Sequence, residues 1–453
     1  MQLRNKYVTL QKKYTLYKSP TVRLIFDNHE VVSLNHIGVA ILKLCNGLNT
    51  IEEIKEVFVK KYNVSRETLS YDIERFILEG INKGYLTICN EKIKNEMNFR
   101  DIDVNPPLMH VYWELTDKCN LICKHCYRYD GVVKEFNEFN FNDSKKMIDV
   151  FYSLGVCKII FTGGEPLLNQ NLLRIAEYVQ SKKIDLILFT NGILINKEIA
   201  KKLKLLNFSF IRISLDGANE KSHEIIRGKN TFHKTIQGIR NCIDNDLNVE
   251  INTLIHKHNM NELFDLYKLC ANLKVGKFRF TEFINEGRAK NNRELFETDS
   301  YVIEEQMKKI NEFKRKFNLN TPIVGDVPIK KEMRLRYLTT KNENYCGIGI
   351  TTCAIAADGD IVPCPLLNRK ELRCGNIYID DLKKVWESSN IFKKFREKYI
   401  VSQFEMCKEC EYSPVCRGGC LAVSYATTGK MRPNQEMCQR IRGYYDKLHD
   451  RSK

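Results

Sequence analysis

The stretch Cys119-Asn-Leu-Ile-Cys123-Lys-His-Cys126-Tyr127 decides how this chain is interpreted, because three thiols fall within eight residues. The apolar run Met109–Leu115 precedes it and is typical of a strand, so the cysteines lie on a tight loop at a strand end. Thiolates are the protein ligands of iron–sulfur clusters, and three of them leave one iron of a four-iron cluster open to a small molecule. A zinc knuckle, with His125 as its fourth ligand, is the alternative.

Composition favours a cytoplasmic protein of more than one domain. The chain has 453 residues, enough for two or three domains. No window approaches the roughly 18 continuous apolar residues of a membrane span, so no membrane partner is expected. The N-terminus lacks the apolar core of a signal peptide. In the reducing cytoplasm, 17 cysteines indicate metal or cluster ligation instead of disulfides.

The net charge of +16 comes from 72 basic and 56 acidic residues. The lysines are spread along the whole chain, which indicates a solvated basic surface. No RNA-binding module is recognisable, so a nucleic-acid partner is not expected.

Between residues 108 and 335, segments with strand and helix character alternate. The six strand-like runs are Met109–Thr116, Lys158–Thr162, Leu186–Thr190, Phe210–Leu215, Val249–Ile255 and Phe278–Phe283. Repeated βα units predict a parallel sheet with ligand sites at the C-terminal strand ends, and six units predict an open partial (β/α)6 barrel. Cys123, Gly163, Asn191 and Asp216 all lie at or just after such ends.

The cysteine loop and the motif Gly163-Gly164-Glu165-Pro166 after the second strand are similar to the motifs of radical S-adenosylmethionine (SAM) enzymes. The resemblance implies a [4Fe–4S] cluster on Cys119, Cys123 and Cys126 with SAM at its open iron. Two glycines permit close approach of the backbone, and a carboxylate accepts a hydrogen bond from the methionyl ammonium group. The other SAM-binding positions that the resemblance implies are Asn191, Ser214, Asp216, Arg227 and Tyr127.

Three of these positions have simpler interpretations. Arg227 would form a surface salt bridge, Asp216 would form a turn, and Tyr127 would only pack. If the resemblance holds, an external reductant such as a flavodoxin or ferredoxin supplies an electron. A 5′-deoxyadenosyl radical made from SAM then removes hydrogen from an unactivated carbon, while the protein orients the reactants. The sequence identifies no general base and therefore no catalytic residue.

The segment 336–453 contains a second array of cysteines. Their spacing resembles a SPASM domain, which holds auxiliary [4Fe–4S] clusters, and the alternative is a pair of zinc ribbons. The resemblance implies a first cluster on Cys346, Cys353, Cys364 and Cys420. It implies a second cluster on Cys407, Cys410, Cys416 and Cys438. Cys353 is the weakest assignment, and Cys374 either replaces it or has no role.

Residues 1–95 predict a separate, winged-helix-like α+β domain. Two strand-like runs, Thr21–Phe26 and Glu30–Ser33, predict a hairpin, and three short helices and a strand at Tyr85–Ile88 follow. The pattern resembles the PqqD-type domain that recognises leader peptides, which implies binding by β-addition at an exposed strand edge. A winged-helix DNA-binding module is the alternative. Residues 96–107 are charged, end in Pro106-Pro107 and predict a linker.

Together, these regions resemble maturases of ribosomally synthesised peptides, including those of bacteriocin biosynthesis. We therefore expect a radical SAM oxidoreductase that binds the leader of a precursor peptide. The expected product is a Cys-sulfur-to-carbon thioether, with carbon–carbon and carbon–oxygen cross-links as alternatives. A sulfatase-type maturase that makes formylglycine is a second hypothesis, against which Pro365 after Cys364 argues. A non-catalytic iron–sulfur carrier or sensor is a third, against which the SAM motif argues.

Overall fold

The computed structural model describes residues 5–11, 15–18, 22–25, 31–34, 36–62, 66–94, 98–102, 104, 106–128, 138–281, 283–317, 323–325, 347–399, 403–410, 418–433 and 438. The chain forms two compact units, and the boundary between them lies after Pro107. Cys346 and Cys416, two predicted ligands of the auxiliary clusters, are outside the described residues.

The first unit contains two small sheets. One sheet is antiparallel, in the order β5-β1-β6, and consists of β1 (Tyr7–Leu10), β5 (Asn46–Thr50) and β6 (Leu86–Cys89). The other has the order β4-β3-β2-β7 and consists of β2 (Thr15–Lys18), β3 (Val22–Ile25), β4 (Val31–Leu34) and β7 (Asn98–Asp101). The predicted hairpin is present as β3 and β4. Strand β7 lies inside the stretch 96–107 that the sequence predicts as a linker, and it pairs with β2.

Three helices complete this unit: α1 (His36–Leu44), α2 (Ile51–Tyr62) and α3 (Arg66–Asn82). Helix α2 begins with a capping box, in which Thr50 Oγ1 accepts from the Glu53 N–H and Glu53 Oε2 accepts from the Thr50 N–H. Apolar residues of the helices and of the β1 sheet form a buried core. All three helices were predicted, but strands β1, β2 and β5 were not.

The second unit is built on a ten-stranded sheet in the order β14-β13-β12-β11-β10-β9-β8-β15-β16-β17. Its parallel strands are β8 (His110–Glu114), β9 (Lys158–Thr162), β10 (Asp185–Thr190), β11 (Phe210–Ser214), β12 (Val249–Leu254), β13 (Lys277–Thr281) and β14 (Ile323–Gly325). All six predicted strands are present in the predicted order. The parallel α/β architecture and the open sheet confirm the predicted fold class.

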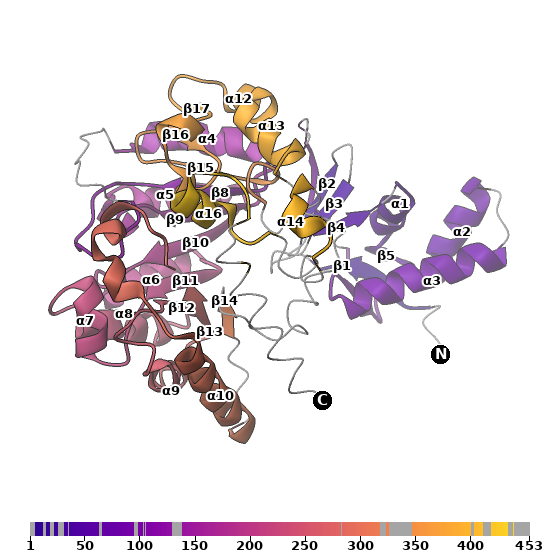
Figure 1. Ribbon diagram of the computed structural model, residues 1–453. Helices are drawn as coiled ribbons and strands as arrows, with labels where there is room; N and C mark the ends of the chain where they lie inside the picture. Colours follow the sequence, from indigo (N-terminus) through magenta and orange to yellow (C-terminus); the bar gives the residue numbers. More distant parts are fainter. Residues whose placement is uncertain are drawn as a thin grey trace. The chain divides into compact units, whose positions relative to one another are not determined.

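The helices between these strands are α4 (Phe141–Ser153), α5 (Leu172–Ser181), α6 (Lys197–Leu205), α7 (Glu220–Arg227), α8 (Phe232–Ile243) and α9 (Leu263–Asn272). Helices α5 to α9 lie along one side of the strands (Figure 1). Strand residues alternate between the two faces of the sheet. In β11, Ile211 and Ile213 are fully buried, whereas Arg212 and Ser214 are partly exposed. We call the side with the partly exposed residues the inner face.

The cysteine-rich C-terminal segment extends this sheet. Strand β15 (Thr352–Ile355) pairs in parallel with β8, and β16 (Asp360–Val362) and β17 (Gly375–Asn376) follow in antiparallel order. The helices that follow are α12 (Leu382–Ser388), α13 (Asn390–Glu397), α14 (Glu405–Lys408) and α16 (Leu421–Thr428). An ion pair between Arg369 and Glu286 also joins this segment to the barrel.

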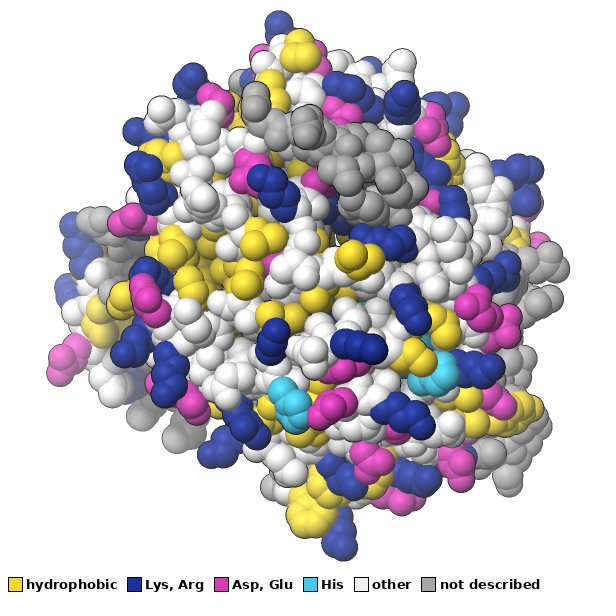
Figure 2. Space-filling view, turned by 90° about the vertical axis from the view of Figure 1, so that its left-hand side faces the viewer, with side chains coloured by type: hydrophobic (Ala, Val, Ile, Leu, Met, Phe, Trp, Pro, Cys, Tyr) yellow, Lys and Arg dark blue, Asp and Glu magenta, His cyan; other side chains and the backbone are white. Residues whose placement is uncertain are grey.

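One face of the molecule carries many Lys and Arg side chains interspersed with Asp and Glu (Figure 2). The basic charge on this face is therefore distributed, as the sequence indicates. No helix in the described ranges combines the length and the apolar character needed to cross a bilayer.

Candidate active site

The loop with Cys119, Cys123 and Cys126 follows β8 and is tied to the ends of neighbouring elements. The Leu115 N–H donates to the carbonyl of Thr162 at the end of β9. The Lys124 N–H donates to the carbonyl of Ile226 at the end of α7. Within the loop, the Cys126 N–H lies 3.3 Å from the Cys123 carbonyl, which closes a tight turn between these two thiols.

A second segment, the 3₁₀ helix η2 (Gly287–Phe296), follows β13 and holds the same loop. The Arg288 N–H donates to the Cys126 carbonyl at 2.9 Å, and Arg288 Nη1 donates to the Cys123 carbonyl at 3.1 Å. Gly287 has a φ of +57°, and a Cβ there would lie 2.6 Å from the Cys126 carbonyl oxygen. The sequence motifs do not include this contact, and its only sequence signal is Gly287-Arg288 after the sixth strand.

The motif Gly163-Gly164-Glu165 packs against the beginning of the cysteine loop. The Gly164 N–H donates to the Thr116 carbonyl at 2.7 Å, and the Glu165 N–H donates to the Lys118 carbonyl at 2.8 Å. Gly163 has a φ of +130°, a conformation that favours glycine. The two glycines are therefore required for contact between β9 and the loop, whatever else they contact.

We predict that Gly164→Ala loosens the cysteine loop, because a Cβ at Gly164 would lie 2.1 Å from the Lys118 carbonyl oxygen. Overpacking of this kind costs about 1–3 kcal/mol. The expected result is a lower thermal midpoint of the second unit and less iron retained after reconstitution. Gly84→Ala is the control for iron retention, because its φ of +77° strains only the backbone of the first unit and no atom lies within 4 Å of the added Cβ. Equal iron retention in both variants would contradict this prediction.

Glu165 is fully buried and connects the ends of two strands. Its Oε1 accepts from Thr190 Oγ1 at 2.7 Å and from the Leu167 N–H at 3.2 Å, and its Oε2 accepts from the Asn191 N–H at 2.9 Å. Burial raises the pKa of Glu165, and these hydrogen bonds oppose the rise. A carboxylate has about four acceptor sites, so room remains for a further donor such as an ammonium group.

Asn191 joins the end of β10 to the cysteine loop, because its Nδ2 donates to Asn120 Oδ1 at 2.7 Å. Ser214 ends β11 on the inner face and is partly exposed. Pro166 begins the short 3₁₀ helix η1 (Pro166–Leu168). Tyr127 is partly buried, and burial, with Glu114 nearby, raises its pKa.

Asp216 and Arg227 form a buried ion pair beneath the cysteine loop. Arg227 Nε donates to Asp216 Oδ2 at 2.6 Å, and the exposed fractions of the two side chains are 8% and 0%. Burial alone would raise the pKa of Asp216, but Arg227 holds it well below its usual range. This pair is not the surface salt bridge that the sequence left open for Arg227.

The guanidinium of Arg227 also faces the cysteine loop. Its Nη1 lies 3.9 Å from Cys123 Sγ, and its Nη2 lies 3.3 Å from His125 Nε2. Burial, together with the nearby charge of Arg227, lowers the pKa of His125 to about 3, so the imidazole is neutral. With Nε2 facing a guanidinium, His125 is poorly placed to bind zinc through that nitrogen.

The donor set of the loop fits a four-iron cluster. The pKa of Cys123 is raised to about 11, because burial and the nearby thiols of Cys119 and Cys126 outweigh the opposing effect of Arg227. Within the described part of the chain, no three His, Cys, Asp or Glu side chains converge closely enough to hold one metal ion. A cluster makes no such demand, because each of its irons takes one sulfur ligand from the protein.

Four of the described C-terminal cysteines form two pairs. The Cys410 N–H lies 3.3 Å from the Cys407 carbonyl, which is the same turn as that between Cys123 and Cys126. Cys364 and Cys420 pack against one hydrophobic cluster. Cys438 is half-buried.

Cys353 differs from the other predicted ligands, because it is fully buried on strand β15. Burial raises its pKa, and Cys374 nearby adds to the rise. Both Cys353 and Cys374 remain candidates for the same ligand position.

Sequence reasoning also missed a buried carboxyl group at the end of β8. Glu114 Oε2 accepts from Arg128 Nη2 at 2.8 Å, and Arg128 also contacts Asp117. Burial raises the pKa of Glu114 to about 7, and Arg128 opposes this rise. Nothing in the motif spacing marks Glu114, because it lies before the cysteine loop.

Family models match three parts of the chain. The radical SAM superfamily matches residues 113–270, and the iron–sulfur cluster-binding domain called SPASM matches residues 346–411. The model of coenzyme PQQ synthesis protein D (PqqD) matches residues 21–86.

Curated relatives are similar at 26–28% identity. The AdoMet-dependent heme synthase of Nitratidesulfovibrio vulgaris is 28% identical over 352 residues, which cover 74% of this chain and 93% of that protein. The antilisterial bacteriocin subtilosin biosynthesis protein AlbA of Bacillus subtilis is 26% identical over 410 residues, which cover 87% of this chain and 85% of AlbA.

The fold is similar to that of Streptococcus suis SuiB bound to S-adenosylmethionine, with a TM-score of 0.68 at 17% identity. That likeness covers 95% of this chain and 100% of SuiB. A structure of SuiB bound to its precursor peptide SuiA gives a TM-score of 0.67. The chain is therefore a radical SAM enzyme with an N-terminal PqqD-type domain and a C-terminal SPASM domain, a combination that uses [4Fe–4S] clusters and SAM.

Proposed function

We propose that this enzyme modifies a ribosomally synthesised precursor peptide, whose leader binds to the first unit. The PqqD-type match at residues 21–86, in one chain with the radical SAM and SPASM domains, carries the proposal. The similarity to AlbA and to SuiB, which has been solved with a precursor peptide, supports it. The proposed product is a thioether, formed in the cytoplasm with a flavodoxin or ferredoxin as reductant.

In this proposal, Cys119, Cys123 and Cys126 hold the SAM-binding cluster. When bound, that cluster and SAM supply one-electron hydrogen abstraction. Glu165 accepts the methionyl ammonium at its remaining acceptor site, and Ser214 lies at the strand end where the methionyl carboxylate is expected. Arg227 keeps a positive charge beside Cys123, which favours the thiolate form that an iron ligand requires.

The auxiliary clusters are assigned on the same basis. The proposed ligands of the first are Cys346, Cys364, Cys420 and either Cys353 or Cys374. Those of the second are Cys407, Cys410, Cys416 and Cys438. The shared hydrophobic cluster beneath Cys364 and Cys420 supports placing these two thiols at one site.

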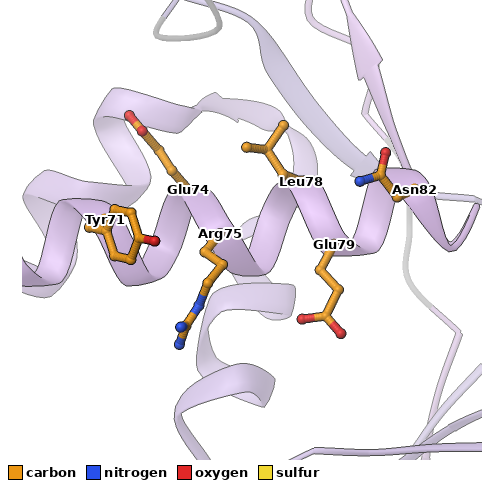
Figure 3. A pocket seen from close by; sticks show the side chains of 6 residues that line it. All are labelled: Tyr71, Glu74, Arg75, Leu78, Glu79 and Asn82. Atoms are coloured by element: carbon orange, nitrogen blue, oxygen red, sulfur yellow. The ribbon is translucent and has the colours of Figure 1, made fainter. Parts of the chain in front are cut away.

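A groove along helix α3 is the proposed contact for leader side chains. It is lined by Tyr71, Glu74, Arg75, Leu78, Glu79 and Asn82, and all six project from this one helix (Figure 3). Two apolar residues there are exposed: Tyr71 by 67% and Leu78 by 43%. Exposed apolar residues seven positions apart on a helix form one stripe, which suits a peptide with matching apolar side chains.

The test uses anaerobically reconstituted full-length enzyme, reductant, SAM and the small precursor encoded nearest its gene. We expect the peptide to lose two hydrogens per cross-link while 5′-deoxyadenosine forms, and fragmentation by mass spectrometry will locate the bond. Replacing Tyr71 and Leu78 together with alanine should raise the KM for the peptide by about thirtyfold or more, since buried interface anchors contribute about 1–2 kcal/mol each and about 1.4 kcal/mol is a factor of ten. Cleavage of SAM without peptide should not change.

Leu205→Ala is the matched control, because Leu205 is 84% exposed on helix α6 of the other unit. An unchanged KM in the α3 double variant would remove the groove from the proposal. An unmodified peptide in the presence of SAM cleavage would overturn the proposed function. A peptide with formylglycine in place of Cys or Ser would support the sulfatase-type maturase instead.

A heme-related activity is the second candidate, because the heme synthase of N. vulgaris matches 74% of this chain. The PqqD-type domain at residues 21–86 favours the peptide. Heme formation from an iron porphyrin, with no modification of the peptide, would reverse this choice.

A further inference from the structure

The inner face of the barrel carries a cluster of charged side chains that the motifs do not include. Glu250 on β12 is 2% exposed, and its Oε1 accepts from Arg212 Nε at 2.6 Å and from Arg279 Nε at 3.0 Å. Lys277 Nζ lies 3.7 Å from Glu250 Oε2. Three cations from β11 and β13 therefore surround one carboxylate.

This cluster has an excess of positive charge. Burial would raise the pKa of Glu250, but Arg212, Arg279 and Lys277 outweigh it and lower that pKa. Burial lowers the pKa of Arg212, and repulsion by the guanidinium group of Arg279 lowers it further. A partly buried cation without a matching anion costs free energy, which an incoming anion would recover.

The two arginines still have hydrogen-bond donors to offer. Each uses its Nε for Glu250, and in the described part of the chain no acceptor is within hydrogen-bond distance of their terminal nitrogens. The guanidinium of Arg212 also stacks on the Phe189 ring, 4.1 Å from its centroid. This contact fixes the plane of the Arg212 guanidinium group. The two terminal nitrogens of a guanidinium group can donate to both oxygens of one carboxylate.

Arg279 lies at the level of Ser214 in the proposed SAM site, because Ser214 pairs with Asn252 and Asn252 pairs with Arg279. Arg212 pairs with Glu250 two residues earlier on the same strands, so the cluster extends from that level toward the N-terminal ends of the strands. The side chain of Arg212 is 18% exposed and that of Arg279 is 29% exposed, so solvent reaches the cluster. The outward residues of the same strands, such as Ile211, Ile251 and Phe278, are fully buried.

We infer that Arg212 and Arg279 bind a carboxylate of the substrate, and so position the peptide segment that is modified. The carboxylate comes from an Asp or Glu side chain of the precursor or from its C-terminus. This inference rests on the proposed function for the peptide nature of the substrate. Arg212 and Arg279 are thus specificity residues for an acidic position in the peptide.

The test compares wild-type enzyme with Arg279→Gln on the full-length precursor, and on precursors in which each carboxylate is converted in turn to its amide. With wild-type enzyme, one of these amides should raise the KM about tenfold or more. Arg279→Gln should raise the KM for the native precursor to a similar extent, with no further increase for that amide. Arg240→Gln on α8, an exposed arginine, is the control and should behave as the wild type.

Arg279→Gln is expected to fold, because Glu250 keeps its hydrogen bond with Arg212. Should that variant not fold, Arg279→Lys provides the second measurement, with a smaller increase in the peptide KM. An increase in the KM for SAM alone would assign the site to the carboxylate of SAM and overturn the inference. A lower thermal midpoint with an unchanged peptide KM would make the cluster purely structural and also overturn it.

The two proposals fail in different ways. If the wild-type enzyme modifies the precursor and no amide changes the KM, this inference alone is overturned. If the wild-type enzyme leaves the precursor unmodified, the proposed function falls, and the peptide carboxylate falls with it.

Discussion

Replacing Cys119, Cys123 and Cys126 together with alanine is expected to reduce SAM cleavage to background. These three thiols share one loop, and Cys119 and Cys126 lie near enough to Cys123 to raise its pKa. The loop also lies against the motif Gly163-Gly164-Glu165. Without them, no sulfur remains to hold the cluster that SAM would bind. Iron and sulfide should fall by one cluster's worth, about four of each per chain, while the auxiliary iron stays.

The measurement is 5′-deoxyadenosine by chromatography, together with iron and sulfide analysis of reconstituted protein. The matched control is Cys407→Ala with Cys410→Ala, which removes the same type of turn from the C-terminal segment. That control should lose about one cluster of iron but keep SAM cleavage in the absence of peptide. Undiminished 5′-deoxyadenosine in the triple variant would disprove the assignment of the loop, and zinc at Cys407 and Cys410 would favour zinc ribbons.

The arrangement of the barrel strands follows from local sequence, and that is why all six predicted strands are present. Each strand is a short apolar run that ends at a turn, and parallel order follows from the helices between the runs. The same logic brings Cys123, Gly164 and Asn191 to one edge of the sheet. There the structure joins them through the carbonyls of Thr116 and Lys118 and the side chain of Asn120.

Contacts between residues far apart in the sequence could not be predicted from local sequence patterns. Arg288 contacts the Cys123 carbonyl across 165 positions of sequence, and no local pattern encodes that pairing. The inner-face cluster of Arg212, Glu250 and Arg279 likewise needs the register of three strands. Strand β7 was missed for the same reason, because a four-residue segment with three polar or charged residues forms a strand only when β2 pairs with it.

Replacing Asp216 with asparagine is expected to lower the free energy of unfolding of the second unit by about 3–5 kcal/mol, the usual cost of removing one partner from a buried ion pair. Arg227 would keep its charge beside neutral His125 with no carboxylate to receive its Nε hydrogen bond. Urea unfolding followed by tryptophan fluorescence measures this change. The chain has two tryptophans, Trp113 and Trp386, and both are buried in the second unit.

The pH dependence of the same measurement has a definite sign. Because the folded pKa of Asp216 lies below its unfolded value, the pair stabilises the protein above pH of about 4 and loses that contribution as the pH falls further. Asp216→Asn should therefore reduce the difference between stability at neutral and at acid pH. Glu198→Gln, which breaks an exposed pair with Lys202, is the control and should change neither quantity measurably.

This experiment also separates two roles for Asp216. The sequence predicted it as a SAM-binding residue, and such a residue would raise the KM for SAM when changed, with little effect on folding. In the structure, Asp216 is fully buried, one carboxylate oxygen accepts from Arg227 and the other accepts from the Leu254 N–H at 2.8 Å. A large loss of stability together with a lower iron content would make Asp216 the residue that positions Arg227 beneath the cysteine loop. A higher KM for SAM at unchanged stability would instead return Asp216 to the cofactor site, and would require the ion pair to open when SAM binds.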